Sequence, residues 1–593
     1  MISVLPIIRL AAALLIGAGC AVYAPFDPFS FSVLTIVQGV AGGTIGFLCT
    51  FGLQGKLNRR LLRFTVPLSF VLALSFVFGE QLQTCGSLYV SFFSVLMLLG
   101  LWALSFLALC HLFVNVPVWL KPKRTYQPIS NRRLLWFTCI SFCILASAWL
   151  LAFYPIITNY DIITQVVQIA RRQYNTHHSL LYTLFIQKVL TIATMAGLSS
   201  TLGFLMVGLL QMLSMAIAVG YGLVTLNTAG ADRRAVIAGA LYYCLFPLFG
   251  YFAFSTTKDT LFSVFLLLSA IEIYRFSRNG TRFWGIVRLV VFGVLTCMLR
   301  FNGMATLALA FIGIAVYLLV YLARRTRPDP ALKYLAILLP LILLLYTGAS
   351  TALVKITGAE TPNTIRRDMI SLPLQQLARV LTVTDNAEDA AKIESLFSAE
   401  DVKALYTPYI ADPVKALLID TDENFAAALT LWLRLSVRYP VIYLEALLEN
   451  TRGAWYIDDL SHTKMDCWTN AYGYLELDQE YGSGDVAYPV AYHSVLPSMQ
   501  AFLKRMFNDN AYLDVPLLRY FFALAVQTWI VILALFYAAY HRRPHAVRML
   551  LFALCVLLPI FLLPRMISRY FLPLFLLNPL CLLALTARKE NAA

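Results

Sequence analysis

Long apolar runs recur along the whole chain, and most reach the roughly 20 residues that a helix needs to cross the hydrocarbon of a bilayer. The runs are too long for strands and lack the alternating pattern of a membrane barrel. Only 13% of the residues are charged and 60% are hydrophobic, whereas a soluble protein carries about 25% charged residues. The sequence therefore predicts an all-α polytopic membrane protein. We expect the first run, residues 3–24, to be a span, since no small-x-small cleavage site follows it before Asp27.

The formal charge of +15 comes largely from short basic clusters between the apolar runs. This distribution follows the positive-inside rule, so we assign the clusters to the cytoplasm and expect no nucleic-acid partner. The clusters are Lys56/Arg59/Arg60/Arg63, Lys121/Lys123/Arg124/Arg132/Arg133, Arg233/Arg234, Arg275/Arg278/Arg282, Arg324/Arg325/Arg327 and Arg542/Arg543/Arg548.

These assignments limit how many runs can cross. Two apolar runs, 180–198 and 202–227, lie between His178 and Arg233. If both crossed, Arg233 would be external, so we expect only the longer second run to span and the first to lie in the outer interface. This arrangement predicts about 14 spans, near residues 3–23, 31–53, 64–79, 90–118, 134–153, 202–227, 235–254, 258–276, 284–299, 304–323, 333–352, 515–540, 548–563 and 567–586.

The acidic residues are unevenly distributed. Most of the 31 Asp and Glu lie between Leu353 and Asp514, which predicts an external, mostly α-helical domain over 353–513. We divide the rest into an N-terminal block of four transmembrane helices (1–118), a transmembrane core (134–352) with a long first external loop (154–200), and the C-terminal transmembrane helices (514–593). On this topology the central spans present two external carboxylates, Asp161 and Asp259.

The stretch YDIITQVVQIARRQYNTHH begins at Tyr160. On a helix, Asp161, Gln165, Gln168 and Arg172 form one polar stripe, at i, i+4, i+7 and i+11. The alternative is an ordinary interfacial helix whose polar face is in water.

Three further external junctions carry cations, in the stretches FSTTKDTLF, LRFNGM and LPRMISRYF. Lys258 and Asp259 could form a mutual ion pair at a helix start, and an arginine can snorkel to headgroups. External arginines nevertheless run against the positive-inside bias, and ionisable residues at such boundaries are usually functional.

Together these residues predict an outward-facing cavity with one or two carboxylates and several cations. Arginine binds two phosphate oxygens at once, and a carboxylate can deprotonate an attacking hydroxyl or amine. A lipid-linked phosphate fits such a site, with its sugar phosphate at the interface and its tail in the bilayer.

Residues 134–586 resemble the GT-C superfamily of membrane glycosyltransferases, which includes protein O-mannosyltransferases and bacterial aminoarabinose transferases. YPIITNYD supplies the acid of the first external loop as Asp161, and TTKD supplies a second as Asp259. THHSLLYTL is similar to the His-Pro-rich entry of the next helix, with Ser179 where Pro is common. SLPLQQLARV, IADPVK, YPVIYLEALLENTRGAWY and SRYFLPLF resemble an uncharacterised bacterial branch.

The resemblance implies an inverting transferase that moves a sugar from a polyprenyl-phosphate donor to an acceptor (cell-envelope glycan, lipid or protein) outside the cell membrane. It implies Asp161 as the general base and Asp259 as the residue that orients the site. The implied donor-phosphate ligands are Arg171, Arg172, Lys258, Arg300 and Arg569, and the implied substrate-binding residues are Gln165, His177, His178, Asn302, Gln375, Gln376 and Arg379.

Several alternatives stay open at the sequence level. Gln375, Gln376 and Arg379 also fit a solvated helix face, and the two histidines also fit a structural role. The first external loop has a single acid at Asp161, preceded by Tyr160, and no DxD motif, so we expect no cofactor and do not favour a divalent metal. The competing function is a transporter or flippase of a lipid-linked glycan, which would place ionisable groups deep inside spans and repeat broken helices in two halves.

Overall fold

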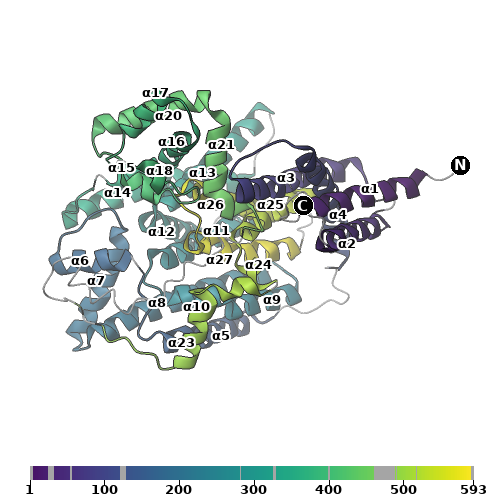
Figure 1. The fold of residues 1–593 in the computed structure, drawn as a ribbon. Coiled ribbons are helices and arrows are strands. Elements are labelled where there is room, and N and C mark those ends of the chain that lie inside the picture. Colours follow the sequence, from purple (N-terminus) through teal and green to yellow (C-terminus); the bar gives the residue numbers. More distant parts are fainter. Residues whose placement is uncertain are drawn as a thin grey trace.

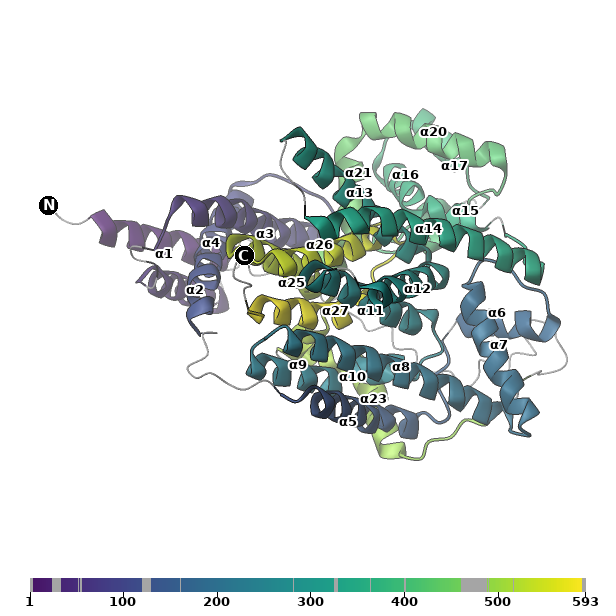
Figure 2. The same cartoon turned by 180° about the vertical axis from the view of Figure 1, so that it is seen from behind.

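A computed structural model gives the fold (Figures 1 and 2). It describes residues 4–23, 33–51, 53, 56–119, 129–159, 161–280, 282–324, 329–362, 364–398, 401–459, 488, 490–515 and 517–588. Five of the basic residues assigned above, Lys121, Lys123, Arg124, Arg325 and Arg327, lie outside these ranges.

Helices make up nearly all of the regular structure. In the described residues no strand forms, and backbone pairing between extended segments is limited to isolated bridges. The N-terminal and central helices are α1 Val4–Val22, α2 Val33–Phe51, α3 Arg59–Cys85, α4 Phe92–Trp119, α5 Asn131–Ala152, α6 Asp161–Arg171, α7 Leu180–Met195, α8 Ser200–Thr228, α9 Arg233–Leu245, α10 Pro247–Ala253, α11 Lys258–Asn279, α12 Phe283–Leu299, α13 Phe301–Ala323 and α14 Pro330–Thr357. The remaining helices are α15 Thr364–Met369, α16 Ser371–Val383, α17 Ala387–Glu394, α18 Val402–Leu405, α19 Asp412–Ala416, α20 Asp422–Arg438, α21 Pro440–Trp455, α23 Pro497–Phe507, η2 Ala511–Asp514, α24 Leu518–Phe522, α25 Leu524–Tyr540, α26 Pro544–Leu557, η3 Leu558–Leu562 and α27 Ser568–Thr586.

Nine helices of the described chain are long and apolar enough to cross a membrane, or up to 11 if each of two bent helix pairs counts as one span. The protein is therefore an all-α, multi-pass membrane protein. One bent pair is α9 with α10, which meet at 53° where the predicted span 235–254 contains Pro247. Four other predicted spans are shorter apolar helices: α1, α2, α12 and α25. The count of 14 spans stays a prediction.

The helix ends that carry basic clusters gather on one side of the bundle. Arg543 donates to the Ala587 carbonyl over 2.6 Å, and Arg278 donates to the Arg588 carbonyl over 3.4 Å. The Asp232 amide donates to Thr586 over 3.1 Å. The ends of α11, α25 and α27 and the start of α9 thus share a side. This agrees with the topology predicted from the basic clusters, which places all of them on one face of the membrane. We call the other side the Asp161 side.

The core of the bundle joins two segments that are far apart in sequence. Buried residues of α5 to α14 and of α24 to α27 form one hydrophobic cluster. The N-terminal helices pack beside it, and α3 and α4 share a smaller cluster with Trp529 and Tyr537 of α25. Within that block the backbones of α1 and α4 touch, since a Cβ on Gly19 would lie 2.6 Å from the Gly100 Cα. Small residues at such crossings let membrane helices approach closely.

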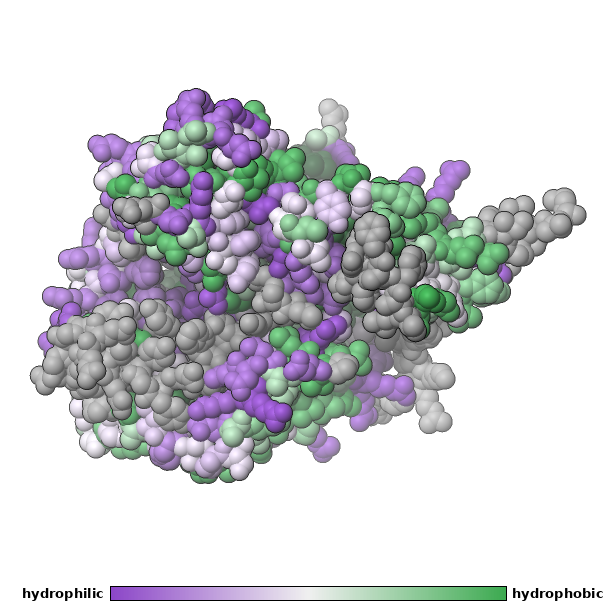
Figure 3. All heavy atoms as spheres, in the orientation of Figure 1, coloured by the Kyte–Doolittle hydropathy of each residue, from purple (hydrophilic) through white to green (hydrophobic). Residues whose placement is uncertain are grey.

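Helices α15 to α21 form a separate helical domain with its own core, built around Leu374, Leu377 and Leu381 of α16. Figure 3 shows hydrophilic side chains over α17 and α20, and hydrophobic ones over the N-terminal block. The domain reaches the bundle next to α27, where the Ala411 amide donates to the Pro564 carbonyl over 2.8 Å. This contact places the domain on the Asp161 side.

Helices α6 and α7 lie at the end of the molecule opposite α1 (Figures 1 and 2). In Figure 2, α7 runs steeply across the direction of α8 and α27 instead of alongside them. This orientation agrees with the interfacial position expected for residues 180–198, which stays a prediction because the structure contains no membrane.

Candidate functional site

The first acid is brought to α11 by a short pairing of two loops. Ile157 and Ser255 form a parallel bridge, in which the Ile157 amide donates to the Phe254 carbonyl over 2.8 Å and the Thr256 amide donates to the Ile157 carbonyl over 2.9 Å. Helix α6 begins four residues after Ile157 and α11 begins three residues after Ser255. The two helix starts are therefore neighbours.

The start of α7 is fixed to the end of α12 in a similar way. Ser179 caps α7 by accepting from the Tyr182 amide over 3.2 Å, and its hydroxyl donates to the Met298 carbonyl over 3.0 Å. Ser179 thus both caps α7 and holds the start of that helix against the end of α12. It brings His178 close to Arg300, which lies between α12 and α13.

Asp161 is the centre of the resulting charge cluster. Lys258 Nζ donates to its Oδ2 over 2.9 Å, and Arg569 donates to the same oxygen over 3.4 Å. His178 Nδ1 lies 3.9 Å from Asp161 Oδ2 and 3.3 Å from Lys258 Nζ. The alternative in which Lys258 pairs with Asp259 is wrong, because Lys258 reaches across to Asp161.

Asp259 pairs with Arg300 instead. Its carboxylate also accepts from the Thr257 hydroxyl over 2.8 Å and is 1% exposed. The Arg300 guanidinium lies 4.7 Å from the centroid of the Tyr570 ring, and the Arg569 guanidinium lies 5.2 Å from the same ring. Tyr570 therefore separates the two arginines and offers each a cation–π contact.

We call Asp161, Asp259, His178, Lys258, Arg300 and Arg569, with Tyr570, the Asp161 cluster. Burial by itself raises the pKa of Asp161, but the charges of Lys258 and Arg569 outweigh it and hold that pKa well below its usual range. Burial and the charge of Lys258 lower the pKa of His178 to about 3. The lowered pKa leaves the His178 imidazole neutral at neutral pH. The cluster therefore combines three basic side chains (Lys258, Arg300 and Arg569) with two acidic ones (Asp161 and Asp259).

Helix α6 is not an ordinary interfacial helix with a polar face in water. Gln165 is 1% exposed and donates to Thr183 of α7 over 3.0 Å. Gln168 is 6% exposed; it donates to Asn175 over 3.2 Å and accepts from the Asn175 amide over 3.2 Å. The polar stripe exists, but protein covers its middle.

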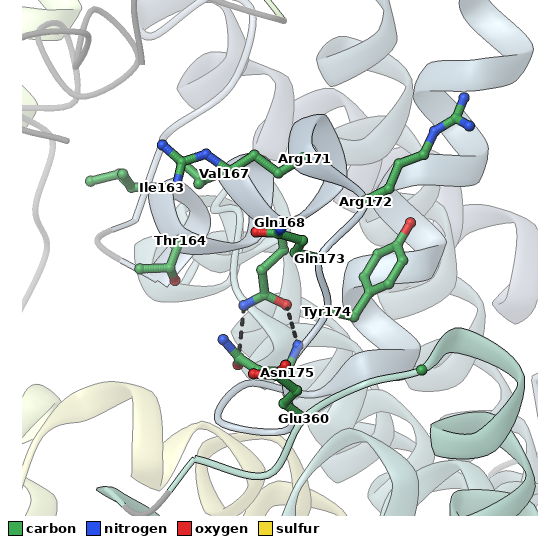
Figure 4. A pocket seen from close by; sticks show the side chains of 11 residues that line it. Ile163, Thr164, Val167, Gln168, Arg171, Arg172, Gln173, Tyr174, Asn175 and Glu360 are labelled. Carbon is green, nitrogen blue, oxygen red and sulfur yellow. Dashed lines mark hydrogen bonds between the residues drawn. The ribbon is translucent and has the colours of Figure 1, made fainter. Parts of the chain in front are cut away.

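Arg171 and Arg172 are exposed at the far end of α6, and the structure does not bring them to the Asp161 cluster. A helix rises 1.5 Å per residue, so ten residues separate Asp161 from Arg171 by about 15 Å. Both arginines line a cavity of about 490 Å³ beside α6 (Figure 4). Arg172 has a φ of 52°, a left-handed conformation that ends the helix and that residues other than glycine seldom adopt.

The three residues of α16 expected at the substrate lie inside the helical domain. They are buried, so the solvated helix face is also wrong. Gln375 donates to the Thr407 carbonyl over 2.6 Å, Gln376 donates to the Tyr443 carbonyl over 3.0 Å, and Arg379 pairs with Glu445 over 2.8 Å. Arg379 also donates to the Gly86 carbonyl, between α3 and α4, and so ties the domain to the N-terminal block. In the described part of the chain, none of the three residues contacts the Asp161 cluster.

Two other expected substrate residues lie near the cluster. The exposed His177 packs edge-on against His178, with ring centroids 4.7 Å apart. Asn302 is half-buried in the first turn of α13, two residues after Arg300. The sequence reasoning passed over Tyr570 and Thr257, although each is adjacent in sequence to a residue it selected. In the described part of the chain, no group of three His, Cys, Asp or Glu side chains is arranged to hold a metal ion.

The comparisons with known proteins identify a family but no activity. We find no match among curated proteins or solved structures. Residues 171–593 match DUF6020, a family of unknown function. The matched region includes Lys258, Asp259, Arg300 and Arg569 and begins after Asp161. Because the match covers well over half of its length, the chain belongs to the DUF6020 family.

Proposed function

We propose that this protein is a membrane glycosyltransferase of the GT-C type. It would transfer a sugar from a polyprenyl-phosphate donor to an acceptor at the outer face of the cell membrane. The observation that carries the proposal is the position of the Asp161 carboxylate, 2.9 Å from Lys258 and 3.4 Å from Arg569. Residues from three distant parts of the sequence meet at helix starts on one side of the bundle.

The cations of the cluster suit the donor phosphate. Lys258 and Arg569 share one carboxylate, and the Asp161, Lys258 and Arg569 side chains keep 13%, 15% and 21% of their surface exposed. The donor is a phosphodiester, so its phosphate carries one negative charge on two non-bridging oxygens, as a carboxylate does, and the planar guanidinium can bind both oxygens at once. Its negative charge rises towards two as polyprenyl phosphate leaves, which strengthens its hold on the cations. The donor phosphate therefore competes with Asp161 for the same two cations.

This competition explains how a carboxylate with a lowered pKa can act as a base. While Lys258 and Arg569 hold Asp161, the carboxylate has little affinity for a proton. When a phosphate draws the two cations away, burial remains and raises the pKa of the carboxyl group. Donor binding thus activates the base at the moment when an acceptor can be used.

The chemical step follows from these roles. Asp161 removes the proton of an acceptor hydroxyl, and the hydroxyl oxygen forms a bond to the anomeric carbon of the sugar. The bond from that carbon to the phosphate oxygen breaks with inversion, and polyprenyl phosphate leaves. Lys258 and Arg569 stabilise the negative charge of the leaving phosphate. Arg300, held by Asp259 and Tyr570, is close enough to support the same group.

The test compares wild-type protein in nanodiscs with Asp161→Asn and with Asp509→Asn, a control in an exposed acid beyond α23. Release of polyprenyl phosphate is followed over a panel of polyprenyl-phosphate sugars. We expect wild type and Asp509→Asn to cleave one donor, and Asp161→Asn to be slower by about 10²- to 10⁴-fold. Normal turnover by Asp161→Asn would exclude it as the base.

The affinity for the product, polyprenyl phosphate, gives a second test, because loss of the Asp161 carboxylate should not weaken binding. Because Asp161 competes for the cations, Asp161→Asn should bind farnesyl phosphate as tightly as wild type or more tightly, whereas Lys258→Met should bind it more weakly. If Asp161→Asn weakened binding as much as Lys258→Met, the carboxylate would be a positioning group for the cations and the displacement step would be wrong.

A flippase or transporter is the second candidate, and the bend of 53° between α9 and α10 favours it, because transporters use broken helices. The bend lies at Phe246, and the carbonyls at the opposite end of α10 are bonded to protein. Gln211 donates to the Ala253 carbonyl over 3.3 Å and to the Ser255 carbonyl over 2.9 Å, and it accepts from Tyr182 over 2.8 Å. Movement of a labelled polyprenyl-phosphate sugar across vesicles without its cleavage would support this candidate.

A further inference from the structure

A half-open cavity of about 490 Å³ runs beside α6 and is separate from the Asp161 cluster (Figure 4). We call it the α6 pocket. Its walls are one side of α6, the turn that follows it, and Gly358 and Glu360 at the end of α14. Since α14 is a candidate membrane span that ends at Thr357, the pocket lies at the boundary of the membrane on the Asp161 side.

The backbone around the pocket is already ordered. The Glu360 amide donates to the Tyr174 carbonyl over 3.0 Å, and the Thr176 amide donates to the Glu360 carbonyl over 2.9 Å. Figure 4 shows Gln168 held by two hydrogen bonds to Asn175, and the Tyr174 hydroxyl donates to Gln187 over 3.0 Å. A pocket with fixed walls binds a ligand without the entropic cost of ordering them.

The polar groups at the rim are available to a ligand. Arg171, Arg172, Gln173 and Glu360 are all exposed. In Figure 4 the side chains of Arg171 and Arg172 extend in different directions from the end of α6, so they do not grip a single anionic group together. No described side-chain contact occupies either guanidinium. The two cations therefore suit a ligand with charges or polar groups at more than one point.

The chemistry of the lining selects the ligand class. The guanidinium groups only donate hydrogen bonds, the Glu360 carboxylate only accepts them, and the amide of Gln173 does both. A ligand that satisfies all of them carries hydroxyl groups, which can donate and accept, together with negative charge for the two arginines. Acidic saccharides have both properties, whereas a neutral sugar or a simple anion has only one.

The position of the pocket relative to Asp161 adds a length requirement. Gln168 lies at i+7 from Asp161 and so on the same side of α6, whereas Arg172 follows the last residue of the helix. The pocket begins at Ile163 and Thr164, one turn or less from the carboxylate, and it ends at the arginines about 15 Å away. A molecule bound to the arginines reaches Asp161 only if it is an extended chain.

We propose that the α6 pocket is the acceptor subsite and that the acceptor is an extended acidic glycan. This inference rests on the proposed function, since it takes Asp161 as the residue that deprotonates the acceptor. The negative charges of the glycan bind Arg171 and Arg172, its hydroxyls bind Gln173 and Glu360, and its end lies at Asp161. Arg171 and Arg172, expected from the sequence to bind the donor phosphate, thus serve the other substrate.

The experiment measures binding of fluorescent hyaluronan oligosaccharides, as model acidic glycans, to the full-length protein in nanodiscs of neutral lipid. Chitin oligosaccharides of the same lengths are the uncharged controls. We expect the hyaluronan octasaccharide to bind, the disaccharide to bind much more weakly, and the chitin series not to bind. The variant Arg171→Ala/Arg172→Ala should lose about tenfold in affinity or more for each arginine, whereas Arg505→Ala, in an exposed arginine of α23, should match wild type.

The donor assay runs in parallel, with water as the acceptor. We expect the double arginine variant to release polyprenyl phosphate at the wild-type rate. If it lost donor cleavage instead, the arginines would belong to the donor site and the inference would be wrong while the proposed function stood. Equal binding of octasaccharide by wild type and variant, or no binding by wild type, would also overturn it. Wild type that cleaves no donor but shows arginine-dependent binding would contradict the proposed function and leave an acidic-glycan site.

Discussion

Two groups of buried charges in this protein differ in a way that separates binding from structure. The Asp161 cluster takes its members from the starts of α6, α11 and α27 and from the loops before α7 and α13. The second group lies at the end of α21, where Arg452 pairs with Glu449 over 2.7 Å and with Asp459 over 3.2 Å. Its three side chains are 7%, 3% and 0% exposed, and all come from one helix and the turn that follows it.

The difference lies in charge balance and access. Around Arg452 two acidic side chains pair with the same guanidinium in a nearly closed space, and burial raises the pKa of Glu449 to about 7. Around Asp161 three cations share two carboxylates, and the cations keep between 12% and 21% of their side-chain surface exposed. A closed group of charges is expensive to disturb, whereas an open, cation-rich group can exchange a carboxylate for a phosphate. Burial of charge alone therefore does not identify a functional site.

The largest effects should separate the two groups cleanly. Arg452→Met removes the ion pairs that two buried acidic side chains make with it, so we expect it to lower the free energy of unfolding by about 3–5 kcal/mol. Arg569→Met leaves Asp161 paired with Lys258, so we expect a loss of only about 1 kcal/mol together with a large loss of donor cleavage. Denaturant unfolding in detergent and release of polyprenyl phosphate measure the two effects.

The same two variants can also contradict the distinction between a binding cluster and a structural one. If Arg569→Met destabilised the protein as much as Arg452→Met, the Asp161 cluster would be a structural ion-pair network like the one on α21. A stable Arg452→Met variant with impaired donor cleavage would likewise move the functional role to α21.

A smaller effect should come from His178, whose pKa burial and the charge of Lys258 lower to about 3 from an ordinary value of 6.5. Between these two pH values the unfolded chain binds a proton that the folded protein does not, so stability falls as the pH is lowered through this window. We expect His178→Gln to flatten the dependence of the melting temperature on pH between about 6.5 and 4. His493→Gln is the control, in an exposed histidine paired with Tyr154 through the backbone. An unchanged slope in His178→Gln would mean that His178 is protonated in the folded protein.

The sequence predicted the positions of these helix ends well, because each is marked by a charged residue in the linear sequence. The ends of three long apolar runs carry Lys258, Arg300 and Arg569. Counting the spans between the basic clusters placed these ends on one side. Helices α11, α13 and α27 begin within three residues of the predicted spans. The distribution of acidic residues predicted a separate domain over 353–513. Helices α15 to α21 form a helical domain within that range, whereas Leu503 and Phe507 of α23 belong to the core of the bundle.

The sequence could not predict which charged residues pair. The pairing depends on backbone contacts between loops, and no residue type in the sequence indicates such contacts. The bridge between Ile157 and Ser255 aligns α6 with α11, and neither residue type signals such a bridge. The polar stripe of α6 was correct as a pattern, but periodicity cannot show whether Gln165 faces water or Thr183. A polar residue on a helix face gives the same signal in both cases.

The smallest effect tests the residues that sequence similarity placed at the substrate and the structure placed in the helical domain. Gln375→Ala removes the hydrogen bond to the Thr407 carbonyl, so we expect a loss of about 1 kcal/mol in the free energy of unfolding. Donor affinity should stay at the wild-type value, because no described contact joins Gln375 to the Asp161 cluster. Lys392→Ala, on the surface of α17 where it pairs with Glu388, controls for changes in the domain that remove no buried bond. A weaker donor affinity in Gln375→Ala at unchanged stability would mean that α16 moves to the Asp161 cluster when substrate binds. The helical domain would then be part of the substrate site, unlike the buried ion pairs around Arg452.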